Sequence, residues 1–178
     1  MNRRIIIVAG RSGSGKSTLS RSLAVALGRE TLGFSYAGRE LAKAEKQSKE
    51  FLNTEEYLYH CISSALLREE LLIIDGLASQ SIFDRLVAEG FGVAVIYLDT
   101  PDRVRIKRIA KRENCSIETA RMIEKAKAAG KAKSGLDYVI RRADTAIDGR
   151  QCAAAILKQA LTYCRAVIDA DNWAMNAE

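Results

Sequence analysis

Short runs of apolar residues alternate along the chain with longer segments in which apolar positions recur three and four residues apart. The short runs are rich in isoleucine, leucine and valine, which is typical of parallel strands that are buried on both faces. The three strongest runs lie at about 3–9, 71–76 and 93–98. Strands that alternate with helices predict an α/β fold, in which helices cover both faces of a mainly parallel sheet.

Weaker signals complete the expected order of elements. Two short strands are expected at 31–35 and 137–140, the second as the last strand of the sheet, and a loop is expected over 141–148. Helical spacing predicts helices from the loop after the first strand to Leu27, and over 54–69, 79–89, 103–112, 117–129 and 149–168.

Residues that start and end helices support parts of this order. Asn53 and Glu56 have the spacing of a capping box, so a helix is expected to begin there. Thr100 is expected to cap the basic helix that follows it, with Pro101 as the first helical residue. The end of the chain, 169–178, is expected to be frayed.

The segment from Gly10 to Ser17 breaks the first apolar run with glycines and leads directly into the first helix. It has the spacing of a phosphate-binding loop, in which backbone N–H groups turn inward around a phosphate at the positive end of a helix. Lys16 is expected to reach the β- and γ-phosphates of a nucleotide, and the Ser17 hydroxyl to bind Mg²⁺. An ordinary glycine-rich turn is the alternative, but such a turn rarely carries this motif between a strand and a helix.

An acidic residue, Asp75, ends the second strong strand. Ligands in parallel sheets bind beyond the carboxyl ends of the strands, and an acid there is placed to hold Mg²⁺ directly or through water. The alternative role is to cap the turn that follows. The metal role is preferred because no other acid follows a comparable strand so early in the chain.

The positive charge is concentrated in one helix, since six of the ten residues from Arg103 to Arg112 are basic. For most of them a solvated helix face is expected. Arg108 and Arg112 are four residues apart and share a face, so we expect these two to contact phosphate. A second basic helix and a basic loop over 130–135 follow, and together they predict a lid, about 108–135, that closes over phosphates and excludes water.

The composition fits one domain, 1–178, that acts on a small anionic substrate. The chain has 178 residues and a formal net charge of +6. Aromatic residues make up only 6% and none lies in the basic helix, which disfavours nucleic acid as a partner. The four cysteines form no C-x-x-C pair, which disfavours a zinc site. With no membrane span and no signal-peptide core, a cytoplasmic monomer or weak homodimer is expected.

With these parts in order, the chain resembles the nucleoside monophosphate kinase family of P-loop kinases, in particular its cytidylate-kinase-like and dephospho-CoA-kinase-like branches. The resemblance implies a three-layer P-loop fold with a five-stranded parallel sheet and a small helical lid. It also implies ATP and Mg²⁺ as cofactors and a small phosphorylated acceptor. The residues that would bind ATP are Gly10, Ser12, Gly13, Ser14, Gly15, Lys16, Ser17 and Thr18.

Further roles are implied by the resemblance. Acceptor binding would involve the helices over about 36–69 and the residues Arg39, Gly76 and Arg121. Catalysis would involve Lys16, Asp75, Arg108 and Arg112. The loop after the last strand, near 143–147, would contact adenine, and Lys131 or Lys133 would complete the lid.

The acceptor and the reaction remain open at this point. A nucleoside monophosphate is preferred over dephospho-CoA or another small metabolite. An ATPase or nucleotide-dependent switch is the main alternative, and the paired lid arginines disfavour it because they suit a site that excludes water. A kinase acting on nucleic-acid ends is the least favoured reading.

Overall fold

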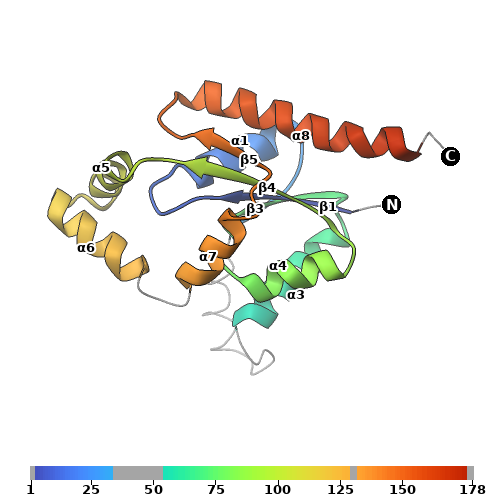
Figure 1. Cartoon of the computed structure of the whole chain (residues 1–178), viewed down its shortest axis with the longest axis horizontal. Helices are drawn as coiled ribbons and strands as arrows, with labels where there is room; N and C mark the ends of the chain where they lie inside the picture. Colours follow the sequence, from blue (N-terminus) through green and yellow to red (C-terminus); the bar gives the residue numbers. More distant parts are fainter. Residues whose placement is uncertain (1–2, 34–53, 129–131, 176–178) are drawn as a thin grey trace.

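A five-stranded parallel sheet forms the centre of the computed structural model, which describes residues 3–33, 54–128 and 132–175 (Figure 1). Its strands stand in the order β2-β3-β1-β4-β5, and every paired strand is parallel. The strands are β1 (Arg4–Ala9), β2 (Thr31–Gly33), β3 (Leu71–Asp75), β4 (Gly92–Asp99) and β5 (Thr145–Asp148). The order, the parallel sheet and the strand positions confirm the expected α/β fold for all but the last strand.

Helices cover both faces of this sheet and produce three layers (Figure 1). One face carries α1 (Lys16–Leu27) and α8 (Ala153–Met175), and the other carries α3 (Thr54–Leu66), α4 (Gln80–Ala88) and α7 (Ala132–Ile140). Alternate side chains of β1 serve the two faces, because neighbouring residues in a strand point to opposite sides. Ile5 and Ile7 belong to the core under α3 and α4, whereas Ile6 and Val8 belong to the core under α1 and α8.

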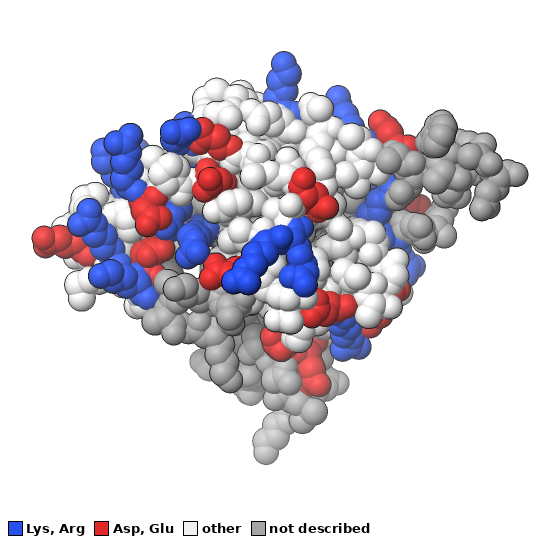
Figure 2. Space-filling model, in the orientation of Figure 1, with Lys and Arg blue, Asp and Glu red and all other residues white. Residues whose placement is uncertain are grey.

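A helical pair extends from one end of the sheet, formed by α5 (Asp102–Glu113) and α6 (Ile117–Ala128) (Figure 1). It has a small core of its own, in which Ile106 and Ile109 of α5 pack with Ala120 of α6. Lys and Arg side chains gather at this end of the molecule in Figure 2, with acidic side chains between them. Among the described residues, no helix combines the length and the apolar character needed to cross a bilayer.

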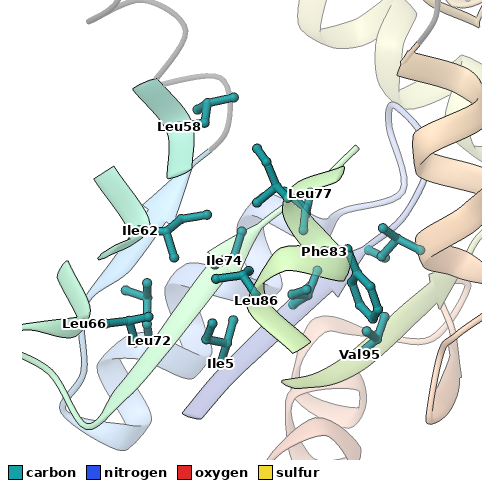
Figure 3. Close-up of a cluster of buried hydrophobic side chains, with 14 of the residues drawn as sticks. Ile5, Leu58, Ile62, Leu66, Leu72, Ile74, Leu77, Phe83, Leu86 and Val95 are labelled. Carbon is teal, nitrogen blue, oxygen red and sulfur yellow. The ribbon is translucent and has the colours of Figure 1, made fainter. Parts of the chain in front are cut away.

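The core between the sheet and α4 suggests a direct test of the packing. Leu86 is fully buried among the side chains shown in Figure 3, and Val87, the next residue of α4, is 51% exposed. Leu86→Ala is expected to lower the free energy of unfolding by about 2–5 kcal/mol, because it leaves a cavity in a closely packed core. The matched control Val87→Ala is expected to change it by less than about 1 kcal/mol. Urea unfolding measures both, and equal losses would contradict this packing.

The last strand is the clearest correction to the sequence prediction. Residues 137–140 are not a strand but the end of α7, and 145–148, expected as a loop, form β5. Val139 is buried in the core on the α4 side, and Tyr138 packs edge-on against Phe83 at 6.0 Å between ring centroids. Three consecutive apolar residues, Tyr138, Val139 and Ile140, suit either a strand or a buried helix, so the local pattern alone could not decide.

The boundaries of three other elements differ from expectation. The basic helix begins at Asp102 with Pro101 as its N-cap, and the Thr100 hydroxyl donates instead to the carbonyl of Ser14 at 3.1 Å. Part of the expected loop over 130–135 is the first turn of α7. The last helix continues to Met175 rather than ending near Ile168.

Candidate active site

The segment between β1 and α1 forms a tight loop at the carboxyl edge of the sheet. Gly13 and Gly15 have φ angles of 78° and 101°, which side-chain-bearing residues rarely adopt. Gly15 is the N-cap of α1, so the loop leads directly into the positive end of that helix. Gly10 lies against Ser14, where an added Cβ would stand 2.5 Å from the Ser14 hydroxyl oxygen. This geometry allows backbone N–H groups to surround a phosphate.

Lys16 and Asp75 come together where β1 and β3 end. These strands pair with Val8 opposite Asp75, and the Gly76 N–H donates to the carbonyl of Val8 at 3.1 Å. The Lys16 side chain passes over Gly76, because a Cβ added there would lie 2.9 Å from Lys16 Cε. Gly76 also has a φ of 78°, so both the backbone conformation and the close approach of Lys16 favour glycine at this position.

One oxygen of Asp75 has no hydrogen-bond donor. Asp75 Oδ1 is buried, and within the described residues it has no partner. Ser17 lies in the first turn of α1 with an exposed side chain. A carboxylate oxygen and a hydroxyl are the hard oxygen ligands that Mg²⁺ prefers, and Mg²⁺ in phosphate sites commonly takes only one or two protein ligands. The donor set therefore fits Mg²⁺, and the described residues contain no group of three or more His, Cys, Asp and Glu that would hold a metal by themselves.

Arg108 closes the other side of the loop. Its Nη1 donates to the carbonyl of Ser14 at 2.8 Å and its Nη2 to the carbonyl of Gly149 at 2.9 Å. The guanidinium also lies beside Gly15, where an added Cβ would stand 3.5 Å from Nη1. Arg108 thus bridges the phosphate loop to the segment that follows β5.

A cavity of about 190 Å³ adjoins this bridge and is mostly apolar at its walls. It lies between the start of α1 and the start of α8, next to the end of β4. Its lining residues are Ser14, Gly15, Thr18, Leu19, Ser22, Leu98, Arg108, Gln151, Ala153, Ile156 and Leu157. Apolar walls with a few polar groups beside a phosphate loop are what a nucleoside requires.

Comparisons with known proteins agree with this geometry. Residues 6–128, more than half of the chain, match the family described as AAA domain, AAA_18. The chain belongs to this AAA domain family. The matched region of the AAA domain includes the whole phosphate loop, Asp75 and the helical pair α5–α6.

A cytidylate kinase of Pyrococcus horikoshii is 31% identical over 131 residues, which cover 68% of this chain and 64% of that relative. The match therefore spans less than two thirds of the relative's length. Among solved structures, a gluconokinase from Sinorhizobium meliloti is 20% identical with a TM-score of 0.59 and covers 98% of both chains. A shikimate kinase from Acinetobacter baumannii in complex with shikimate is 21% identical with a TM-score of 0.58 and covers 94% of both chains. This AAA domain chain therefore has the fold of the P-loop kinases.

The other residues predicted for the site of this AAA domain are either exposed or outside the described residues. Arg112 lies one turn beyond Arg108 with an exposed side chain, and its Nε donates to Glu113 Oε1 at 2.9 Å. Arg121 is exposed on α6. Arg39 and Lys131 lie outside the described residues, as does most of the acceptor segment, and the side chain of Lys133 is not described either. Their predicted roles stay predictions.

The expected adenine segment shifts because the last strand shifts. Residues 145–147 of that segment belong to β5, whereas the loop after the last strand is 149–152. It is this later loop that borders the cavity, through Gln151, and that meets Arg108 through the carbonyl of Gly149. The contact of this loop with adenine stays a prediction, and the loop it concerns is 149–152 rather than 143–147.

The sequence prediction missed two arginines that connect the phosphate loop to neighbouring helices. Arg11, the second residue of the loop, forms an ion pair with Asp137 of α7 at 3.0 Å. Arg105, expected on a solvated helix face, is 2% exposed and donates to the carbonyl of Ser12. Arg105 precedes Arg108 by three residues and so shares its helix face, but equivalent spacings link other basic residues of α5, and the pattern could not single it out.

Proposed function

We propose that this protein is an ATP-dependent kinase that transfers a phosphoryl group to a small phosphorylated acceptor, most specifically a nucleoside monophosphate of the cytidylate type. The observation that carries the proposal is the passage of the Lys16 side chain over Gly76, the residue that follows Asp75 with its buried, unpaired oxygen, at the end of the phosphate loop. The cytidylate kinase relative supports the acceptor class.

The donor nucleotide would be held from two sides. Backbone N–H groups of the loop would bind its phosphates, since they are directed by the glycine turns at Gly13 and Gly15. The base would enter the cavity between α1 and α8, whose apolar walls are completed by the polar residues Gln151 and Arg108. A guanidinium beside an aromatic base adds a stacking contact.

The transfer step needs positive charge around the moving phosphoryl group, because negative charge spreads over its equatorial oxygens in the transition state. Lys16 would supply part of this charge from the start of α1, and the predicted lid arginine Arg112 would supply more from α5, whereas Arg108 would lie at the base end of the nucleotide. Mg²⁺, held by Ser17 and Asp75, would neutralise charge on the phosphates when bound. A phosphate monoester acceptor is already ionised, so no side chain has to remove a proton from it.

A hydroxyl acceptor, such as dephospho-CoA or a sugar-like metabolite, is the second candidate. Asp75 favours it, because a carboxylate oxygen without a donor, at the end of β3 beside the phosphate loop, could accept a proton from an alcohol. The gluconokinase and shikimate kinase structures share this fold. An ATPase or switch without an acceptor is the third candidate.

ATP consumption against a panel of acceptors separates these candidates. The panel contains CMP, dCMP, UMP, AMP, GMP, dTMP, dephospho-CoA, gluconate and shikimate, each with Mg²⁺, together with a reaction lacking acceptor. We expect turnover with pyrimidine monophosphates and negligible ATP loss without acceptor. Turnover only with hydroxyl acceptors would favour the second candidate, and ATP loss that ignores every acceptor would overturn the kinase proposal.

A further inference from the structure

A buried arginine of α5, Arg105, has no role in the proposed reaction but contacts the backbone of the phosphate loop. The side chain of Arg105 is only 3% exposed, yet it carries a full charge. Its Nη1 donates to the carbonyl of Ser12 at 2.9 Å and to Glu124 Oε1 at 3.1 Å, and its Nη2 donates to Asp102 Oδ1 at 2.5 Å. Burying a charge is costly unless it is paired and hydrogen-bonded, and these partners satisfy both Nη atoms of Arg105, whereas its Nε has no partner among the described residues.

The bond to Ser12 fixes the orientation of a peptide in the loop. The C=O of one residue and the N–H of the next belong to one planar trans peptide and point in opposite directions. Because Arg105 holds the carbonyl of Ser12 toward α5, the N–H of Gly13 is turned to the opposite side, away from α5. Arg108 does the same for the next but one peptide, since it holds the carbonyl of Ser14 and so orients the N–H of Gly15.

The same guanidinium connects the loop to α6. Arg105 Nη1 is shared between the Ser12 carbonyl and Glu124, a half-buried residue of α6 whose side chain is 19% exposed. The other carboxylate, on Asp102, is 87% exposed and is therefore screened by solvent. The position of α6 thus determines how much of the charge of Arg105 is balanced inside the protein.

Close packing leaves this part of the loop little freedom to adjust. A Cβ added to Gly13 would lie 2.7 Å from the carbonyl oxygen of Arg105 and 3.0 Å from the Ile109 side chain, so α5 lies directly on the loop backbone. Ile109 also belongs to the small core that joins α5 to α6. A shift of α6 would therefore change both the packing of α5 on the loop and the charge that surrounds Arg105.

We propose that Arg105 is a positioning residue that links α6, through Glu124, to the orientation of the Ser12–Gly13 peptide, so that the affinity of the loop for ATP depends on Glu124. Glu124 would then control nucleotide binding from a helix outside the phosphate loop, without contacting the nucleotide. The inference rests on the proposed function only in that the loop binds nucleotide phosphates.

Calorimetric titration with the β,γ-imido analogue of ATP and Mg²⁺ tests this link. Glu124→Gln keeps the shape of the side chain and removes its charge, and we expect it to weaken binding about threefold to tenfold. Glu118→Gln makes the same charge change at an exposed position of α6 and is expected to leave binding unchanged. In an Arg105→Lys background, which has no fork to share between Ser12 and Glu124, Glu124→Gln is expected to have little further effect.

Two readouts distinguish positioning from a merely structural role. All variants are measured at a temperature at which their melting curves show the folded state, so a loss of stability alone leaves the dissociation constant unchanged. Equal affinity of Glu124→Gln, Glu118→Gln and the unaltered protein would overturn the inference, even if the protein phosphorylates an acceptor. Weaker binding by Glu124→Gln in a protein that phosphorylates no acceptor would support the inference and overturn the proposed kinase function.

Discussion

Replacing Lys16 with alanine is expected to slow phosphoryl transfer by roughly a thousandfold or more. The Lys16 side chain passes over Gly76 at the end of the loop, and its ammonium group would meet the β- and γ-phosphates. Removing it takes away positive charge where negative charge develops, and water cannot replace a charge that is already positioned. Steady-state turnover with the preferred acceptor measures the loss.

The matched control is Lys158→Ala, which removes an exposed lysine from α8. It changes the net charge by the same amount and is expected to leave turnover within about twofold of the unaltered protein. Melting temperatures of both variants show whether they are folded. Near-normal turnover of a folded Lys16→Ala protein would contradict the assignment of the loop as a catalytic phosphate site.

Asp75→Asn is expected to lower turnover by about a hundredfold and to raise the Mg²⁺ concentration needed for half-maximal rate. Asparagine keeps the size of the side chain and one oxygen but loses the negative charge that would help to hold the ion. Because Asp75 Oδ1 is buried without a donor, the change is expected to leave stability unchanged or to increase it, as is common when strained functional groups are removed. Turnover measured over a Mg²⁺ titration, with thermal melting, tests both parts.

Glu70→Gln provides the control at the opposite end of the same strand, since Glu70 immediately precedes β3 and is exposed. It removes one carboxylate without approaching the phosphate loop, and neither turnover nor Mg²⁺ dependence is expected to change. A Mg²⁺ dependence of Asp75→Asn that matches this control would mean that Asp75 serves only to hold the turn after β3.

The strands predicted with most success are those whose side chains are buried on both faces of the sheet. β1, β3 and β4 are apolar along most of their length because both faces of the sheet are covered, so their patterns leave little room for another structure. α4 shows the opposite case, a clear apolar stripe with Ser79 as its N-cap, and its position was also predicted.

The position of the last strand was predicted wrongly for a physical reason. β5 is a four-residue edge strand in which only Ile147 is buried, and it is held by pairing with β4 rather than by its own apolar content. The β-prone residues Tyr138, Val139 and Ile140 form a helix instead, and α7 packs closely on the turn after β3. A Cβ at Gly135 would stand 2.3 Å from the carbonyl oxygen of Ala78, so glycine permits a contact that no local pattern encodes.

The sequence by itself determined the phosphate loop, its strand and helix, and the acid at the end of β3, because each depends on residues that are neighbours in the chain. Only the tertiary structure decided which arginines of α5 serve the loop. Arg105 and Arg108 hold the carbonyls of Ser12 and Ser14, more than ninety positions away along the chain, and Arg112 pairs with Glu113 beside it. Helical spacing places all three arginines near one face, and the packing of α5 on Gly13 selects two of them as partners of the loop.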